Sequence, residues 1–468
     1  MSRVLTRLML VCVLLGIVAP AAHASHTQVM TFEAPRELLD PAQREQAFER
    51  IASLGARSLR VILYWQDVAP SPNAARKPTF DATDPTAYDW SRYDPVLTEA
   101  ARRGWSVILT VTGPVPKWAT AGGRDHVTRP SAREFQAFMT AVGKHYGSQV
   151  HTWAIWNEPN HPDFLAPQYS AKGHRPLSPG IYRNLFLAAW RGLRASGNGR
   201  ERLLMGETAP RGNTRVVAPL TFLRGALCLN STYVKKRSCS NLPADGYAHH
   251  AYSTRLGPFF KPPGPNDVTI GVLNRLVRAL DRAAAAGAIR RGLPIYLTEF
   301  GIQSVPDPFY GVSLAQQAEY YAISERIAYR NPRVRSFSQY LLRDDDPNAG
   351  GERYGGFESG LEFADGRIKR PAYDGFRLPL VAVRGGSRVT LWGRVRPVTS
   401  PTTAEILVAD RGSGFHRLRD ARTDARGVWS TRTTYRKGRR WRLRWKGPDG
   451  TTFTGPPIRA YTSSGKAG

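Results

Sequence analysis

Short apolar runs alternate with segments of helical periodicity over most of the chain, from about Gln28 to Leu378. This alternation is typical of repeated βα units and a parallel sheet. We therefore predict an α/β protein built on a (β/α)8 TIM barrel. A doubly wound open sheet is the competing fold, and it is disfavoured because no glycine-rich phosphate fingerprint follows the first strand. The expected strands are Gln28–Phe32, Ser58–Trp65, Ser106–Val111, Trp153–Trp156, Arg202–Gly206, Gly246–Tyr252, Pro294–Thr298 and Val334–Leu342.

Helical spacing of apolar residues recurs between these runs. At one of the segments, Ser131 is followed three residues later by Glu134, which is the spacing of a capping box. The expected helices are Pro41–Leu54, 89–103, Ser131–Tyr146, Ser178–Ala195, Asp267–Ala286 and Ser313–Arg330.

The period changes to two after Pro379, where short alternating runs are separated by Gly, Pro and Asp turns. This pattern predicts a second domain over residues 381–468, a small antiparallel β-sandwich that follows a barrel domain of residues 25–380. From Arg440 to Trp445 basic and apolar residues alternate strictly, so one face should be core and the other an arginine ladder. The expected strands are Ser387–Val395, Ala404–Val408, Val428–Tyr435, Trp441–Lys446 and Thr451–Phe453.

The first 24 residues have the order of a secretory signal peptide. Arg3 and Arg7 precede an apolar run from about Leu8 to Val18, and Ala22-His23-Ala24 supplies a small-residue cleavage site. The run is too short to span a bilayer, so cleavage after Ala24 is favoured over an uncleaved anchor. We predict a secreted, extracellular protein with no membrane span after cleavage.

Two cysteines, Cys228 and Cys239, remain after the expected cleavage. They flank a polar segment, and in an exported protein such a pair forms a disulfide more often than a metal site. We predict a stapled surface loop.

The chain carries a formal charge of +29, and residues 381–468 hold 19 Lys and Arg against 5 Asp and Glu. Export argues against nucleic acid as the partner of this basic tail. A solvated sheet face is the simplest reading. Adhesion to an anionic cell-envelope polymer is the functional alternative.

Two of the expected strands end in a glutamate. Glu158 follows the fourth strand in Trp156-Asn157-Glu158-Pro159, and Glu299 follows the seventh in Thr298-Glu299-Phe300-Gly301. Active sites of α/β barrels lie at the carboxyl ends of the strands, so the two side chains should meet at one mouth. Pro159 should hold Glu158 in an extended conformation and end the strand. Two carboxylates in such a setting suggest an acid/base pair.

These two motifs resemble the clan A retaining glycoside hydrolases, namely the cellulase-like barrels of family 5 and relatives such as family 39. The segment from Ser359 to Tyr373 is similar to the closing hairpin and last short helix of those barrels. The resemblance covers the chain up to about Leu380 and implies that Glu158 is the general acid/base and Glu299 the nucleophile. Retaining hydrolysis requires such a pair with oxygens about 5 to 5.5 Å apart.

Arg60 is the one charge in the second strand, and an interior arginine needs a carboxylate partner. The resemblance makes Glu299 that partner. It also implies that Tyr252 of His250-Ala251-Tyr252 contacts the nucleophile and that Asn157 hydrogen-bonds the sugar 2-hydroxyl. Strand alternation directs the neighbouring His249 toward the helices instead, as a core histidine.

Aromatic residues at strand ends are candidates for sugar contact, because flat rings suit the faces of pyranoses. Trp65 and Trp118 are the principal ones, and each ring taken singly is more often packing than subsite. The acidic run of Asp344, Asp345 and Asp346 could bind a cation or sugar hydroxyls, but a solvated loop is the simpler interpretation. The other aromatic candidates are Trp156, Phe164, Tyr169 and Phe309.

The family pattern is incomplete in two places. Members usually carry a histidine after strand three, where this chain has Thr110-Val111-Thr112-Gly113, and a tryptophan at strand eight, where it has Gln339-Tyr340. The reaction we predict is hydrolysis of a β-linked oligo- or polysaccharide by a retaining glycosidase without cofactor or catalytic metal. A transglycosylase that remodels wall polymer and a non-catalytic carbohydrate-binding barrel remain as alternatives.

Overall fold

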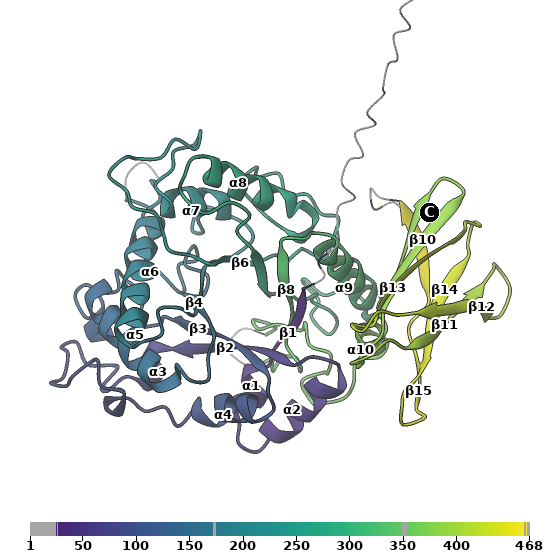
Figure 1. Ribbon diagram of the computed structural model, residues 1–468, viewed down its shortest axis with the longest axis horizontal. Coiled ribbons are helices and arrows are strands. Elements are labelled where there is room, and N and C mark those ends of the chain that lie inside the picture. Colours follow the sequence, from purple (N-terminus) through teal and green to yellow (C-terminus); the bar gives the residue numbers. More distant parts are fainter. Residues whose placement is uncertain (1–24, 26, 172–174, 349–352, 463–464, 466–468) are drawn as a thin grey trace, which may run out of the picture.

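The computed structural model describes residues 25, 27–171, 175–348, 353–462 and 465. Two parts are visible in Figure 1, a ring of strands and helices and, on one side of it, a second sheet. The predicted signal peptide lies outside the described residues. Within them, no helix has the length and apolar character needed to cross a membrane.

Eight parallel strands form a closed barrel in chain order, as predicted. Each strand pairs with the next, and β8 closes the ring on β1 with Thr31 opposite Ser338. The strands are β1 (Val29–Glu33), β2 (Ser58–Tyr64), β3 (Ser106–Thr112), β4 (Thr152–Ile155), β5 (Arg202–Thr208), β6 (Gly246–His250), β7 (Ile295–Glu299) and β8 (Val334–Tyr340).

Helices surround the barrel (Figure 1). Ser131 and Ser313 accept hydrogen bonds from the third backbone N–H of α5 and α9, and Ser313 completes a full capping box with Gln316. Short helices α1, α3 and α7 were absent from the prediction. The helices are α1 (Pro35–Leu39), α2 (Arg44–Ser53), α3 (Trp65–Val68), η1 (Pro85–Ala87), α4 (Asp94–Arg102), η2 (Lys117–Ala119), α5 (Ala132–Tyr146), α6 (Ser178–Ala195), α7 (Pro219–Ala226), η3 (Ile270–Val272), α8 (Asn274–Ala285), α9 (Leu314–Tyr329) and α10 (Ala372–Arg377).

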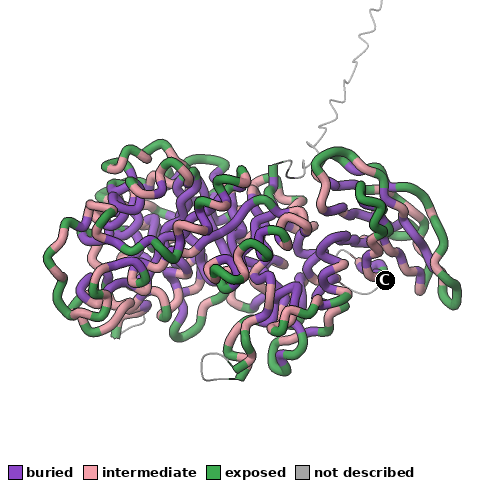
Figure 2. The backbone as a smooth tube through the Cα atoms, turned by 90° about the horizontal axis from the view of Figure 1, so that it is seen from below, coloured by how far each residue is buried: buried purple, intermediate pink, exposed green. Residues whose placement is uncertain are grey.

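Strand alternation separates two apolar layers, and Figure 2 shows the interior of this part as buried. Outward-facing residues such as Leu59, Trp153 and Phe337 pack against the helices in one large core. The barrel interior holds a small cluster that consists of Ile108, Ala154, Leu204, Ala248 and Tyr296. Above this cluster the inward-facing residues are polar, so polar side chains line the mouth of the barrel.

The second sheet begins at Leu380, and its core is formed by inward residues from both halves, for example Leu391 and Trp441. Its strands follow one hydrogen-bonded path in the order β12-β11-β14-β16-β9-β10-β13, with β15 beside β14. The sheet is antiparallel except for the β16–β9 pair. The strands are β9 (Leu380–Gly385), β10 (Arg388–Arg394), β11 (Thr403–Ala409), β12 (His416–Arg422), β13 (Val428–Thr434), β14 (Arg440–Lys446), β15 (Thr452–Thr454) and β16 (Ile458–Thr462).

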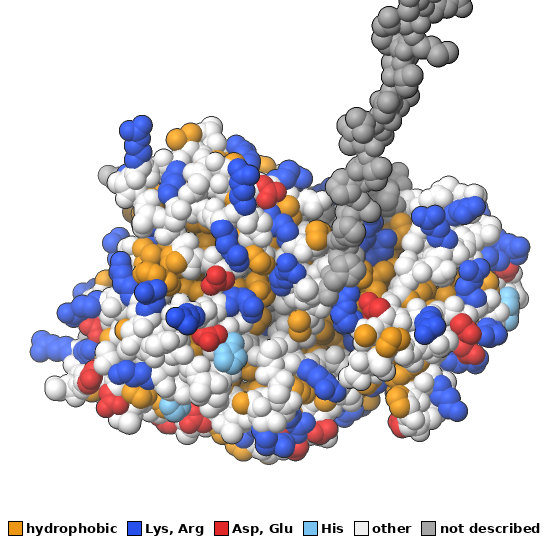
Figure 3. Space-filling model, in the orientation of Figure 1, with side chains coloured by type: hydrophobic (Ala, Val, Ile, Leu, Met, Phe, Trp, Pro, Cys, Tyr) orange, Lys and Arg blue, Asp and Glu red, His pale blue; other side chains and the backbone are white. Residues whose placement is uncertain are grey.

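In β14 the predicted alternation is present, with Trp441, Leu443 and Trp445 buried. Three strands, β9, β12 and β16, were missing from the prediction. Most side chains of β12 are polar and solvent-facing, so it shows no apolar alternation. It is an edge strand, and charges on an edge oppose pairing with other chains. The Lys and Arg side chains in Figure 3 are scattered over both parts of the molecule rather than confined to one.

The sheet packs on α9 of the barrel. Ile323 of α9 lies in an apolar cluster with Val381, Trp392 and Tyr461. Beside it, Glu325 accepts hydrogen bonds from Arg394 and Arg396, in a largely buried ion pair. Breaking such a pair leaves a buried charge uncompensated, so the interface resists separation.

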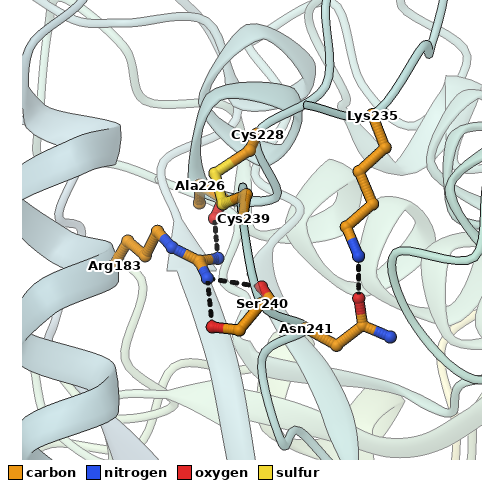
Figure 4. Close-up of a disulfide and its surroundings, with 7 residues drawn as sticks. All are labelled: Arg183, Ala226, Cys228, Lys235, Cys239, Ser240 and Asn241. Carbon is orange, nitrogen blue, oxygen red and sulfur yellow. Dashed lines mark hydrogen bonds between the residues drawn. A yellow bond between two sulfur atoms is a disulfide. The ribbon is translucent and has the colours of Figure 1, made fainter. Parts of the chain in front are cut away.

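A disulfide joins Cys228 and Cys239, as predicted. It closes the segment between α7 and β6 (Figure 4). Arg183 of α6 donates hydrogen bonds to the carbonyl oxygens of Ala226 and Ser240, on either side of the bridge. The loop is thus held covalently and by one buried guanidinium.

Candidate active site

The two glutamates predicted from the strand ends meet at the barrel mouth. Glu158 lies three residues after β4, and Glu299 is the last residue of β7. One carboxylate oxygen of each lies within 4.8 Å of the other. The 141 residues between them in the chain are spanned because all eight strands point their carboxyl ends to one mouth.

The backbone at Glu158 was predicted to be extended, and this prediction is wrong. Its φ is +38°, and that of Trp156 is +70°, in the left-handed region that non-glycine residues seldom adopt. Glu158 N–H donates to the carbonyl of Glu207 and its own carbonyl accepts from His161, which holds the turn in place. Tertiary contacts therefore override the local preference set by Pro159, and such strained residues concentrate at functional sites.

Arg60 is the centre of the polar network beneath the pair. Its guanidinium is 1% exposed and donates to Glu299 Oε1 at 2.6 Å, which agrees with the predicted partner. Two further carboxylates contact it: Glu33 Oε2 lies 2.6 Å from Nη1, and Glu207 Oε2 lies 2.6 Å from Nη2. Burial lowers the pKa of Arg60, but the three carboxylates outweigh it and raise that pKa well above its ordinary value.

Glu33 and Glu207 were not predicted as site residues. Both stand at strand ends, in Phe32-Glu33 and Gly206-Glu207, as Glu158 and Glu299 do. The predicted strands stopped one residue short of each. A search for every acidic residue at the end of a strand would have found them. Burial, which outweighs the effect of Arg60, raises the pKa of Glu33 to about 8.

His250 and Tyr252 lie between the two glutamates, on the face that strand alternation predicts. The Tyr252 hydroxyl donates to Glu299 Oε2 at 3.1 Å. His250 Nδ1 is 2.9 Å from Glu158 Oε1 and 3.4 Å from Glu299 Oε2. Burial lowers the pKa of His250 against the opposing effect of Glu299, so the imidazole is neutral at pH 7. With a proton on Nδ1, it donates toward the carboxylates.

Asn157 is held from both sides. Its Oδ1 accepts from Arg60 Nη2 at 2.7 Å, and its backbone N–H donates to Thr112 Oγ1 at 2.9 Å. Thr110 Oγ1 contacts both Arg60 and Glu207. The two threonines thus position the network at the strand where the family usually has a histidine. Because Oδ1 of Asn157 is occupied, its amide NH2 is the group that can donate to a ligand.

The two catalytic candidates differ in their surroundings. Within the described part of the chain no arginine pairs with Glu158, and burial raises its pKa to about 7. Glu299 accepts hydrogen bonds from a guanidinium and a phenol. A carboxyl group that keeps its proton near neutral pH, beside a second glutamate paired with a cation, is the arrangement that an acid and a nucleophile require.

His249 is a core residue, as predicted. Its ring is fully buried, with Nδ1 2.9 Å from Thr208 Oγ1 and Nε2 2.8 Å from the Val268 carbonyl. Asp344, in contrast, was predicted to lie in a solvated loop, but it is buried. It is 1% exposed and pairs with Lys369 Nζ at 2.6 Å, whereas Asp346 of the same acidic run is exposed.

Trp65, a candidate for sugar contact, is a packing residue, which is the more frequent role expected for each ring taken singly. Trp65 starts α3 rather than ending β2, and its fully buried ring stacks on Phe138 of α5 at 4.9 Å. Trp118 packs edge-on against Trp65 at 5.8 Å and is 8% exposed. Trp156 is likewise fully buried, whereas Phe309 is 62% exposed. Large aromatic rings gain more by filling the layer between barrel and helices than by lining the mouth.

Glu158, His250 and Glu299 bring three potential metal-ligating atoms within 4.8 Å of one another. Arg60 already neutralises Glu299 at 2.6 Å, and its fixed positive charge repels a cation at that point. Acid/base chemistry therefore suits these residues better than metal binding. The absence of a catalytic metal stays a prediction.

A TIM barrel whose mouth holds two closely spaced glutamates in unlike environments is the arrangement of a glycosidase. The sequence model "Cellulase (glycosyl hydrolase family 5)" matches residues 21–329. The chain belongs to glycosyl hydrolase family 5, and it is a glycosidase. No curated protein matches it.

Solved structures of glycosidases share the fold. The chain is similar to a family 39 glycoside hydrolase from the gut symbiont Bacteroides cellulosilyticus WH2, with a TM-score of 0.52 and 15% identity over 90% of this chain and 81% of that one. It is also similar to the GH39 enzyme from Xanthomonas axonopodis pv. citri, with a TM-score of 0.51 and 15% identity over 93% and 95%. A third similar structure is a monomeric beta-xylosidase from Caulobacter crescentus CB15, with a TM-score of 0.50 and 16% identity over 93% of this chain and 97% of that one.

Proposed function

We propose that this protein is a secreted, retaining glycosidase that hydrolyses a β-linked oligo- or polysaccharide by double displacement. The observation that carries the proposal is the separation of the two carboxylates, within 4.8 Å. Retaining enzymes hold their carboxyl groups about 5 to 5.5 Å apart, whereas inverting enzymes leave about 6.5 to 9.5 Å for a water.

In the first step, Glu158 gives its proton to the glycosidic oxygen while Glu299 attacks the anomeric carbon. A covalent glycosyl-enzyme forms, and the aglycone leaves. In the second step, Glu158, now ionised, takes a proton from water, which displaces Glu299. Arg60 and Tyr252 stabilise the carboxylate of Glu299 before attack and after release. Asn157 is placed to donate to the sugar 2-hydroxyl.

The test is the configuration of the first product. Proton NMR of a reaction with an aryl β-glycoside, or with a β-linked oligosaccharide that the enzyme accepts, should record the β-anomer before mutarotation. Initial release of the α-anomer would overturn the retaining mechanism and leave the glycosidase assignment standing.

Activity should fall as pH rises through about 7. The reason is that the pKa of Glu158 is raised to about 7, so the protonated form that the first step needs is lost above that value. The measurement is kcat/KM between pH 5 and 9. A dinitrophenyl leaving group departs without a proton, so kcat/KM for a dinitrophenyl glycoside should fall less above pH 7 than kcat/KM for a substrate with a poorer leaving group. An equal fall for both substrates would contradict the role of Glu158.

We further infer that the second domain retains the enzyme on an anionic cell-envelope polymer. β12 presents exposed arginines, among them Arg419 and Arg422. Replacing both with Gln should reduce retention on anionic polymer beads and leave kcat/KM on a small substrate unchanged. Replacing Arg102, an exposed arginine of the barrel, with Gln is the control, and equal retention of all three proteins would contradict the inference.

A further inference from the structure

A pocket of about 480 Å³ opens at the barrel mouth beside the catalytic pair. Glu33, Tyr64 and Tyr340 line it from the ends of β1, β2 and β8. Glu33 shares Arg60 with Glu299, and the ring of Tyr340 lies 6.2 Å from that of Tyr252, which contacts Glu299. The pocket therefore adjoins the nucleophile, and its volume suits a small ligand such as a sugar residue.

Two arginines line the same pocket, Arg36 and Arg92. Arg36 donates from Nε to Glu37 and from Nη2 to the Asp344 carbonyl. Arg92 makes one ion pair and no hydrogen bond among the described residues; the ion pair, of 3.6 Å with Asp67, involves Nε. Nη1 of Arg36 and both terminal nitrogens of Arg92 therefore keep N–H groups for a ligand. Guanidinium groups recognise carboxylate and sulfate-like oxygens through paired hydrogen bonds.

Two acidic residues, Glu33 and Asp40, line the same pocket. Asp40 accepts hydrogen bonds from the Ala42 N–H and from Gln43 Nε2, and these bonds lower its pKa, so it remains an anion. Glu33 pairs with Arg60 at 2.6 Å, which compensates its charge, and its buried Oε1 has no hydrogen-bond partner among the described residues. The free N–H groups of Arg36 and Arg92 are thus the donors that the pocket offers to an anionic group.

We propose that this pocket binds a negatively charged sugar residue, on the glycone side of the scissile bond. The shared chemistry is an anionic group on the ring, either the carboxylate of a uronic acid or a sulfate ester. The formal charge of +29 favours the same class of substrate, because a positive field raises the local concentration of an anionic polymer. This inference rests on the proposed glycosidase function.

The experiment compares kcat/KM of the full chain on matched substrates: neutral β-linked oligosaccharides and aryl β-glycosides, their uronic-acid counterparts and their sulfated counterparts. At least one anionic series should exceed the neutral one by about tenfold or more, the effect of one charge-assisted hydrogen bond. Preference for uronic acid or for sulfate identifies the source of the charge. Turnover of neutral substrates alone would overturn the inference and leave the proposed function intact, whereas no turnover of any series would count against the function.

Variants of the two pocket arginines distinguish a role in substrate recognition from a role in folding. Arg92→Met should lower kcat/KM about tenfold on the anionic substrate, mostly through KM, and leave the neutral substrate within about twofold. Arg36→Met should act in the same direction. Arg133→Gln is the control, because that side chain is 90% exposed on α5. Equal losses on both substrates in the Arg92 variant would overturn the proposal, since a purely structural role predicts that result.

Discussion

Replacing Glu299 with Gln is expected to abolish glycoside hydrolysis, with a loss in kcat on the order of 10⁴-fold or more. The substitution removes the nucleophile and keeps its shape. The amide oxygen can still accept from Arg60 or Tyr252, so the local contacts survive. Folding should be preserved, because the variant removes one of three carboxylates that crowd Arg60. The measurements are kcat on the best substrate and the thermal midpoint of unfolding.

The matched control is Glu134→Gln on α5, where a carboxylate paired with Lys77 and not with Arg60 is removed. This variant should keep its kcat within about twofold, since a partly exposed ion pair contributes only about 0.2–1 kcal/mol. A Glu299 variant with kcat within tenfold of the unmodified enzyme would refute the assignment of the nucleophile.

Replacing Arg60 with Met is expected to give the largest loss of stability. Glu33, Glu207 and Glu299 would then face one another without a cation. Removal of one partner from a buried ion pair costs about 3–5 kcal/mol, because the remaining charge has neither water nor a counter-ion. Activity should be lost as well, since Glu299 would lose the guanidinium that holds and charge-balances its carboxylate.

The sign of the pH dependence distinguishes this explanation from a simple packing defect. Burial already raises the pKa of Glu33 to about 8, and the loss of Arg60 removes the charge that opposes this rise. The folded variant therefore holds its proton more strongly than the unfolded chain, so it is favoured at low pH and loses stability as pH rises. Urea unfolding at pH 5 and pH 8 should therefore give a smaller deficit at pH 5. A deficit that is equal at both pH values would contradict the argument.

Arg60→Lys supplies an intermediate case if the Met variant does not fold. An ammonium keeps the charge but is a point charge on a flexible stem, whereas the guanidinium contacts three carboxylates and Asn157 at once. We expect this variant to fold with reduced kcat. Full activity in Arg60→Lys would show that geometry at this residue is unimportant.

The order of the barrel was predictable because apolar runs and helical periodicity are local features of the chain. The same holds for Glu158 and Glu299, since each stands where an apolar strand run stops, and for Arg60, the charge in an apolar run. The second domain was recognised from its period of two. Strand β12 was not predicted, because a solvated edge strand has no alternation of apolar and polar residues.

Local patterns failed where a neighbour from another strand decides the outcome. Glu33 and Glu207 look like the polar ends of ordinary strands, and their contact with Arg60 exists only because closure of the barrel brings β1, β2 and β5 together. Trp65 has the sequence context of a strand end, but the aromatic residues of α5 bury its ring. Glu158 adopts a left-handed backbone because Glu207 and His161 hold it there.

The positions of Glu158 and Glu299 are thus encoded in the chain, because hydrophobic patterning dictates where strands end and which residues follow them. The hydrogen bonds and ion pairs that hold Arg60, the raised pKa of Glu158 and the arginine-lined pocket depend on the folded protein. Burial and charge contacts between distant strands create these properties, and neither exists until the barrel closes and excludes water from its mouth.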